Sequence, residues 1–476
     1  MNHSHSHSRR HLLKSGLGLA VSGPAAFALN LANMNAAVAQ TAGDYKALVC
    51  LFMHGGNDHA NTVVATNGDS WKNYQAMRGG TIALAAPGSG GNALLPITPG
   101  NLASFGNSGL TLGLHPRLSK TQALFQARKL AIISNVGPLV EPTTAEQYRY
   151  MQTRVPRRLF SHNDQQSTWQ TFSPEGNAAG WGGRMVERLA STHNASALFA
   201  SAISAGGSPA AWLAGRQISP YSIPTEGAIG VQFLGDMGIG AREQALRAVL
   251  NAERSGNLLA QTFANLHRRT LDYQSTLQQG LIDENHSSLL AVPDLAESAG
   301  TKNPLAIQMR LMARVIASRN SIGIRRQIFF LNMPGFDTHD DQQYAHTRLM
   351  GQLDQALDYF DRQMTALGMQ NQVTLFTASD FGRNMVSNGG GTDHGWGSHH
   401  FILGGAVDGG RLYGRFPTFG VDAGDDVGGR LVPQYSVEQY AAVLGRWFGL
   451  TQSELYDALP NLMNFPRDSG LGFMKA

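Results

Sequence analysis

The chain is poor in cysteine, in long apolar runs and in net charge. Cys50 is the single cysteine among 476 residues, so no intrachain disulfide can form. It lies in the apolar run ALVCLFM, where we expect a buried and unreactive thiol. Outside the N-terminal segment, no stretch approaches the ~20 apolar residues of a membrane-spanning helix. These absences exclude a disulfide framework and a membrane span in the mature protein.

The formal charge of +4 is concentrated at the N-terminus. Arg9, Arg10 and Lys14 lie within the first 39 residues, which hold no acidic residue, and without these three cations the charge falls to +1. A nearly neutral chain gives no electrostatic reason to expect nucleic acid or an anionic membrane as a partner. The length suffices for one large α/β domain or two ordinary ones.

Residues 1–39 have the order of features of an export signal. The stretch SRRHLLKSG puts paired arginines before a moderately apolar segment, and AVA at residues 37–39 offers a cleavage site. We predict a twin-arginine signal peptide, with the export machinery as a partner and a periplasmic or secreted mature protein. The alternative is a cytosolic protein with a disordered basic tail. This route carries folded proteins, so a cofactor can be inserted before export.

Four short apolar runs that end in turn residues predict buried strands, at 45–53, 130–137, 327–333 and 373–379. A long amphipathic helix is predicted between the last two strands, at 340–368. A strand, a long helix and a second strand form a right-handed crossover, which requires parallel pairing. The sequence therefore predicts an α/β fold with a central, mostly parallel sheet between two helical layers.

The remaining segments fit one domain over 45–476. Residues 241–322 read as a mainly helical elaboration that either covers the sheet or forms an inserted lobe. Residues 79–113, rich in glycine and asparagine, predict a long surface excursion. SVEQ at 436–439 has the pattern of a capping box and predicts the start of a final helix.

Three of the predicted strands run directly into acidic turns. The first is followed by Asp58, the third by Asp337 and His339, and the fourth by Asp380. The carboxyl ends of parallel strands share one edge of the sheet, where ligands bind in open α/β folds. Carboxylates gathered there would repel one another unless a cation lay between them. Each piece alone has a structural explanation, such as a helix cap at Asp58, and the prediction of a metal site rests on their coincidence.

A glycine-rich loop follows the fourth strand and carries further ligand types. It contains Asp393, His394, His399 and His400. Mixed imidazole and carboxylate ligands suit zinc, manganese or iron better than calcium. Because adjacent side chains usually diverge, we expect only one of His399 and His400 to point at the metal.

The sequence resembles a known bacterial family through five stretches: SRRHLLK, LFMHGGNDHANTVV, LHPRLSKTQALFQARKLAIISNVG, FDTHDDQ and SDFGRNMVSNGGGTDHGWGSHHFILGGAV. It is identified as a member of the family named domain of unknown function 1501. That family is grouped with the alkaline phosphatase and sulfatase-like superfamily. The resemblance implies an alkaline phosphatase-like three-layer fold with one or two divalent metal ions, and hydrolysis or transfer of phosphate or sulfate esters.

The resemblance also implies roles for particular residues. It makes Asp58, Asp337, His339 and Asp380 metal ligands, with a final histidine supplied by His399 or His400. Phe381 stands where superfamily members have a histidine after the aspartate, and His394 could supply that ligand from the loop.

The nucleophile and the anion clamp are implied only by the resemblance. The stretch RRLFSHNDQQSTW (157–169) faintly resembles the region near the nucleophile of superfamily phosphodiesterases, which makes Ser161 the first candidate and Thr62 its rival. Arg383 or Arg158 could clamp the ester oxygens, because a guanidinium matches phosphate and sulfate.

Three functions follow as hypotheses. The first is an exported metal-dependent hydrolase of phosphate or sulfate esters, acting on a small-molecule or polymer substrate. The second is a non-catalytic envelope or binding protein that keeps the fold and a structural metal, as the phenylalanine at 381 suggests. The third is a redox or oxygen-dependent metalloenzyme, because aspartate and histidine also suit iron.

Overall fold

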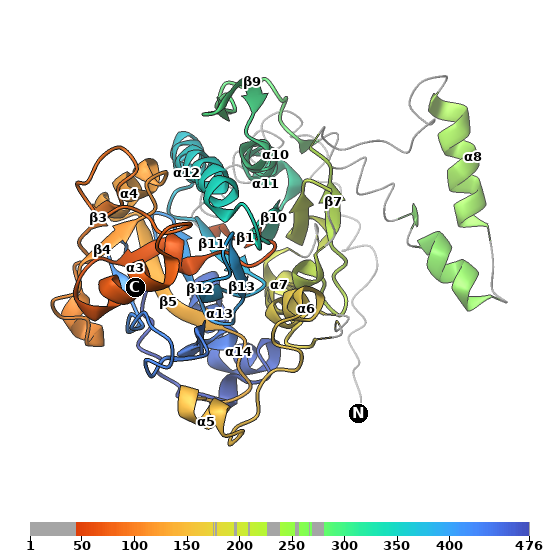
Figure 1. The fold of residues 1–476 in the computed structure, drawn as a ribbon. Helices are drawn as coiled ribbons and strands as arrows, with labels where there is room; N and C mark the ends of the chain where they lie inside the picture. The colour runs from red at the N-terminus through yellow and green to blue at the C-terminus, as the bar shows by residue number, and fades with distance from the viewer. Residues whose placement is uncertain are drawn as a thin grey trace, which may run out of the picture. The chain divides into compact units, whose positions relative to one another are not determined.

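The computed structural model describes most of the chain beyond the predicted leader (Figure 1). The strands and helices named below belong to the unit Lys46–Ala476. Residues 1–39, and with them the predicted signal peptide, lie outside the described residues, as does part of the predicted elaboration at 241–322. The described residues are 44–475 without 175, 177–178, 195–197, 208–209, 226–238, 253–256, 266 and 269–279.

The four apolar runs form strands of one sheet, within a residue of their predicted bounds. They are β1 (Lys46–Met53), β5 (Leu130–Gly137), β10 (Arg326–Met333) and β11 (Val373–Ser379). All residues of β5 and β11 are buried, as expected for strands that are covered on both faces.

The sheet is mostly parallel. Its strand order is β15-β5-β14-β11-β1-β10-β6-β7, and β18 also pairs with β5. β1 runs parallel to both β10 and β11, and β14 is antiparallel to both of its neighbours. The predicted α/β class is therefore confirmed. The added strands are β6 (Ala202–Ala205), β7 (Tyr221–Ile223), β14 (Ser398–Leu403), β15 (Leu412–Tyr413) and β18 (Tyr435–Ser436).

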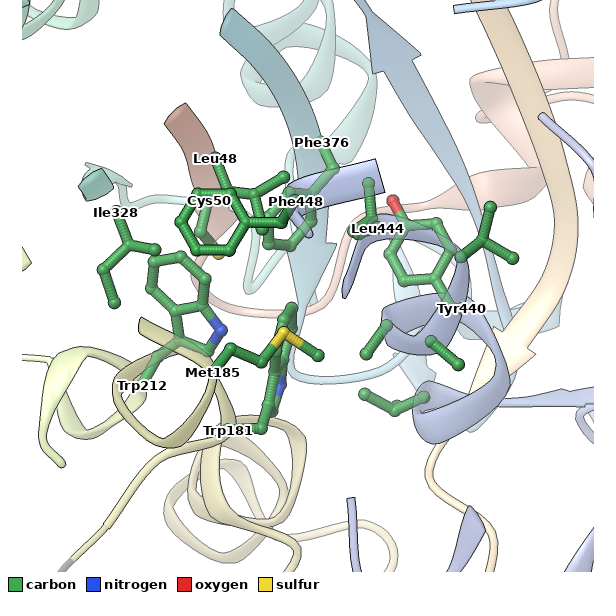
Figure 2. Packing of buried hydrophobic residues seen from close by; sticks show 14 of the residues in the cluster. Leu48, Cys50, Trp181, Met185, Trp212, Ile328, Phe376, Tyr440, Leu444 and Phe448 are labelled. Carbon is green, nitrogen blue, oxygen red and sulfur yellow. The ribbon is translucent and has the colours of Figure 1, made fainter. Parts of the chain in front are cut away.

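Helices cover the two faces of this sheet. Leu48, Cys50 and Ile328 of the strands pack against Trp181, Met185, Trp212 and Tyr440 in one apolar core (Figure 2). The helices on this face are α6 (His162–Thr171), α7 (Trp181–His193), α13 (Val437–Phe448) and α14 (Gln452–Ala458).

The opposite layer consists of α4 (Ser119–Gln126), α10 (Pro304–Ala317) and α12 (Gln342–Ala366). α4 contacts β5, α10 contacts β10 and β6, and α12 packs on both helices (Figure 1). α12 is the predicted crossover helix between β10 and β11. No helix within the described part of the chain is long and apolar enough to cross a membrane.

Local sequence signals explain several element boundaries. The predicted capping box opens α13, because Ser436 Oγ accepts from Gln439 N at 3.1 Å and Gln439 Oε1 accepts from Ser436 N at 3.0 Å. The predicted excursion 79–113 contains two strands of a small separate sheet. The other elements are η3 (His59–Asn61), β2 (Val63–Ala65), α3 (Gly68–Arg78), β3 (Leu95–Ile97), η4 (Leu102–Phe105), β4 (Leu112–Leu114), α5 (Ala145–Arg149), η5 (Leu198–Ser201), η6 (Ala211–Leu213), α8 (Ile239–Asn251), β8 (Asp294–Leu295), β9 (Ser298–Lys302), α11 (Arg319–Ile322), β12 (Arg383–Ser387), β13 (Thr392–His394), β16 (Asp426–Val427), β17 (Arg430–Leu431) and η7 (Leu462–Asn464).

The three central strands end level with one another. Met53, the last residue of β1, is paired with Met333 of β10 and with Ser379 of β11. The turns that follow these strands therefore leave the sheet side by side, along what we call the carboxyl edge. Every polar turn singled out in the sequence begins there.

Candidate metal centre

Four side chains converge at the carboxyl edge. His162 is the first residue of α6, Asp337 and His339 lie in the turn after β10, and His394 ends β13. Each offers one ligand atom, and these atoms all lie within 4.8 Å of one another. Segments far apart in the sequence thus meet at one point.

The spacing of these atoms matches that of a tetrahedral metal site. Asp337 Oδ1 lies 3.3 Å from His162 Nε2, 3.1 Å from His339 Nε2 and 3.5 Å from His394 Nε2. Tetrahedral zinc with bonds of about 2.0–2.1 Å separates its ligand atoms by roughly 3.3 Å. Three imidazole nitrogens and one carboxylate oxygen therefore already have the separations that such an ion requires.

Each histidine is oriented through its other ring nitrogen. His162 Nδ1 lies 2.7 Å from Asp380 Oδ2, and His394 Nδ1 lies 2.7 Å from the Phe160 carbonyl oxygen. His339 Nδ1 lies 3.4 Å from a carboxylate oxygen of Asp393. Metal-binding histidines typically donate their second N–H to such acceptors, which fixes the tautomer and leaves Nε2 as a lone pair.

The resulting lone pairs require a positive partner. The Phe160 carbonyl can only accept, so His394 Nδ1 carries a hydrogen and Nε2 of the neutral ring carries none. Yet His394 Nε2 lies 2.8 Å from His339 Nε2, and the buried Nε2 of His162 has no hydrogen-bond partner among the described residues. A single cation would satisfy all three nitrogens, so the residues present fit a metal ion.

Arg383 orients the carboxylate ligand. Its guanidinium is fully buried and donates to Asp337 Oδ1 at 2.9 Å and to the Gly55 carbonyl at 3.1 Å. Burial acts to raise the pKa of Asp337, but the hydrogen bond from Arg383 and the neighbouring positive groups together hold the pKa below its ordinary value. Asp337 therefore remains an anionic ligand, and the guanidinium is occupied by protein atoms.

Two glycines allow the loops to approach. Gly55 has a φ of +115°, and a Cβ there would lie 2.2 Å from the backbone nitrogen of Asp337. A Cβ on Gly391 would lie 2.2 Å from the carbonyl oxygen of Thr338. Both contacts are closer than atoms tolerate, so only glycine lets the turn after β1 and the loop before β13 pack on the turn after β10.

The sequence interpretation missed His162. Ser161 drew attention as a nucleophile, and its neighbour was read as part of the same motif without a role. A signal was available, because His162 lies directly after Ser161 at a predicted helix start. What the sequence could not indicate is that α6 begins at the carboxyl edge beside β11.

Asp380 and Phe381 surround the cluster without adding a ligand atom to it. Asp380 Oδ2 receives His162 Nδ1 and also accepts from Gln166 Nε2 at 2.9 Å. The hydrogen bond to Asp380 is the main reason that the pKa of His162 is raised. The ring of Phe381 lies 4.8 Å from that of His162 and 4.7 Å from that of His394, and so forms an apolar wall of the site.

Asp58 already has a cationic partner. Its carboxylate accepts from Arg78 Nη1 at 2.5 Å, from Arg78 Nη2 at 3.0 Å and from Gln342 Nε2 at 2.5 Å. The ion pair is completely buried. Burial acts to raise the pKa of Asp58, but the charge and hydrogen bonds of Arg78 outweigh it and lower the pKa to about 2. A guanidinium thus neutralises the carboxylate for which a metal role was predicted.

His399 and His400 lie within the sheet. Both belong to β14 and are buried, and His400 is paired with Ile133 of β5. His399 Nδ1 accepts from the Asn135 backbone at 3.1 Å, while the ring of His400 lies 5.2 Å from that of Trp169. Burial lowers the pKa of His400 to about 3. These histidines are neutral and lie outside the four-residue cluster.

The two candidate nucleophiles lie in different surroundings. Thr62 is buried, and its hydroxyl donates to the Asp58 carbonyl at 2.8 Å. Ser161 is half-buried, directly precedes His162, and donates through Oγ to Asp164 Oδ2 at 2.6 Å. Of the two, the serine is the one adjacent to the cluster.

Two arginines flank the cluster. Arg158 lies 3.2 Å from Asp164 through Nη1. Arg430, which the sequence interpretation missed, donates from Nε to the His394 carbonyl at 3.0 Å, and its guanidinium lies 4.9 Å from the Phe160 ring. Positive charge therefore lies beside the candidate metal centre, on the segments that carry two of its histidines.

Fold and site together define an α/β protein with a histidine and aspartate cluster, capable of binding a metal, at the carboxyl edge of its sheet. The model of the family described as "Protein of unknown function (DUF1501)" matches residues 45–454. The chain belongs to that family, which confirms the resemblance noted from the sequence. No curated protein matches the chain.

Several solved structures are similar at low identity. The PsFucS1 sulfatase from Pseudoalteromonas sp. shares 12% identity at a TM-score of 0.35, covering 93% of this chain and 74% of its own. The lipoteichoic acid synthase LtaP from Listeria monocytogenes shares 6% at 0.35, covering 88% and 76%. The alkaline phosphatase from the Antarctic bacterium TAB5 shares 11% at 0.28, covering 88% and 99%. The function proposed next rests on the geometry of the site.

Proposed function

We propose that the protein is an exported hydrolase of phosphate or sulfate esters that depends on one divalent transition metal ion. The observation that carries this proposal is the convergence of His162, Asp337, His339 and His394 within 4.8 Å. Zinc fits three imidazoles and a carboxylate well, and manganese and iron take the same ligand types. Bound there, the ion would supply Lewis acidity toward an ester oxygen.

One ion is proposed rather than two. A second ion would need Asp58, which Arg78 already neutralises in a buried pair, and Asp380, which orients His162. The residues implied as ligands by the superfamily resemblance are therefore divided between the metal centre and its protein support.

The arginines beside the cluster suit an anionic substrate. Guanidinium groups bind phosphate and sulfate oxygens through paired hydrogen bonds. Arg430 and Arg158 lie next to the histidine-bearing segments, whereas Arg383 is buried and holds Asp337. We assign substrate contact to Arg430 and Arg158, and ligand positioning to Arg383.

Ser161 is the proposed nucleophile. Its Oγ attacks phosphorus or sulfur, the bond to the leaving alcohol oxygen breaks, and the hydroxyl proton passes to Asp164, which already accepts a hydrogen bond from Oγ at 2.6 Å. Water then cleaves the seryl ester and regenerates the enzyme. Asp164 and Arg158 hold the serine side chain in place.

The test combines metal analysis with ester turnover. The exported protein should contain about one equivalent of transition metal and hydrolyse an aryl phosphate, a phosphodiester or an aryl sulfate. His162→Ala should lose both the metal and the activity, and His286→Ala, an exposed histidine outside the cluster, should lose neither. Ser161→Ala should keep the metal and lose activity. Metal-free wild-type protein, or full turnover in Ser161→Ala, would contradict the proposal.

Export by the twin-arginine route is part of the proposal. The paired Arg9 and Arg10 precede an apolar segment and a cleavage site. Replacing both arginines with lysine should retain the uncleaved precursor in the cytoplasm, as measured by cell fractionation. Equal export of the variant would remove this part of the proposal without affecting the metal centre.

The alternative is a non-catalytic protein with a structural metal, and Phe381 favours it. Its ring packs against two of the four candidate ligands, where the superfamily resemblance implies a histidine. Chelation would then lower the melting temperature, while all tested esters would remain unhydrolysed by the metal-loaded protein.

A further inference from the structure

A second cavity lies close to the metal centre and is built partly from the same segment. It has a volume of about 390 Å³ and is lined by Arg157, Thr168, Phe172, Glu438 and Asn461, among others. Small-molecule sites typically enclose about 300–1,000 Å³. Thr168 follows His162 by six residues on α6, a rise of about 9 Å. The cavity is therefore a pocket of ligand size that is separate from the metal ligands.

Glu438 provides a buried acceptor at this cavity. It is 1% exposed, and its Oε1 accepts from Asn461 Nδ2 at 2.8 Å. The other oxygen, Oε2, is buried and has no hydrogen-bond partner among the described residues. An unpaired buried carboxylate oxygen is costly, so a ligand that supplies an N–H or O–H donor there would be favoured.

Arg157 provides a cation at the exposed end. Its side chain is exposed and makes no ion pair within the described part of the chain. Arg154 lines the same cavity but is paired with Glu141, through Nη2 to Oε2 at 3.3 Å. The free positive charge of the cavity is thus that of Arg157, opposite in position to the buried Glu438.

The charges argue against a cationic ligand. Burial raises the pKa of Glu438 to about 7, and among the opposing influences is the positive charge of Arg184. A ligand ammonium beside Glu438 would be repelled by that guanidinium. A hydroxyl donor has no such penalty. An anionic group at the other end of the same ligand would meet Arg157.

The walls between these two groups are apolar. They include Phe172, Pro156, Pro174, Leu139 and Val155. Such walls pack against the C–H faces of a ring whose hydroxyls point outward. A purely apolar ligand would leave Glu438 Oε2 unpaired, and a simple anion would leave the walls uncovered.

We infer that this cavity binds an anionic sugar unit, with a ring hydroxyl donating to Glu438 Oε2 and the anionic group bound by Arg157. The site does not depend on the proposed hydrolysis, because none of its residues belongs to the metal cluster. A uronic acid has both features and serves as the probe.

Calorimetric titration with glucuronate tests the inference. The wild-type protein should bind glucuronate more tightly than glucose, and Glu438→Gln and Arg157→Gln should each weaken binding about tenfold. Arg154→Gln is the matched control, since its charge is already paired, and it should change the dissociation constant less than twofold. His162→Ala should bind glucuronate as the wild type does, which separates this site from the metal centre.

Several outcomes would overturn the inference. They are no heat of binding at millimolar glucuronate with folded protein, equal affinity for glucose and glucuronate, or equal losses in the two arginine variants. Loss of binding in His162→Ala would assign glucuronate to the metal centre instead. Circular dichroism and melting curves of each variant establish that the protein tested is folded.

Discussion

Glu438 makes a quantitative prediction about stability. The carboxyl is buried at the start of α13, and burial raises its pKa from an ordinary 4.5 to about 7. A difference of this size corresponds to about 3 kcal/mol, at about 1.4 kcal/mol per pKa unit. Glu438→Gln removes the titration while keeping the shape of the side chain and the acceptor for Asn461.

The direction follows from proton linkage. Below pH 4.5 the carboxyl is protonated in both the folded and the unfolded chain, and its contribution to stability is intact. As the pH rises toward 7 the unfolded chain releases the proton while the folded chain holds it, so stability falls. Above pH 7 both states are ionised and the loss stays constant. The wild type should therefore lose about 3 kcal/mol relative to Glu438→Gln between pH 4 and pH 8.

Differential scanning calorimetry at several pH values measures this loss. With an unfolding entropy of about 2.1 cal/mol/K per residue, the unit Lys46–Ala476 should shift by roughly 1 °C per kcal/mol. The melting temperature of Glu438→Gln should thus exceed that of the wild type by roughly 3 °C more at pH 8 than at pH 4.

Glu146 is the matched control, because it occupies the same position in the capping box of α5 but is exposed. Its glutamine variant should show no pH-dependent difference. A gap between Glu438→Gln and the wild type that does not change with pH would refute the reasoning.

Three further predictions concern the site and the core. Asp380→Asn should keep the metal but weaken its binding 10- to 100-fold in chelator competition, because Asp380 orients His162; unchanged affinity would contradict this role. Arg78→Met should destabilise the protein by about 3–5 kcal/mol in thermal unfolding, because it leaves Asp58 buried without its cation; a stable variant that gains a second metal ion would restore Asp58 as a ligand. Trp212→Ala should cost about 3–5 kcal/mol through loss of packing in the main core, with metal content unchanged; a loss within 1 kcal/mol would contradict this estimate of the core.

The sequence by itself determined the strands and the edge where the chemistry gathers. Apolar runs such as 130–137 and 373–379 could become only buried strands, and a long helix between two of the strands required parallel pairing. Parallel strands end on one side, so Asp337, Asp380 and the glycine-rich loop had to share that edge. These outcomes follow from hydrophobicity, chain length and handedness, which are local or nearly local properties.

Tertiary structure alone decided which side chains meet. His162 reaches Asp337 because α6 begins at the carboxyl edge, and nothing in its own segment states that position. Asp58 pairs with Arg78, twenty residues later, whereas His400 is held inside β14 by pairing with β5. Coordination requires atoms to converge within about an ångström. That convergence depends on loop paths and side-chain directions which sequence spacing leaves open.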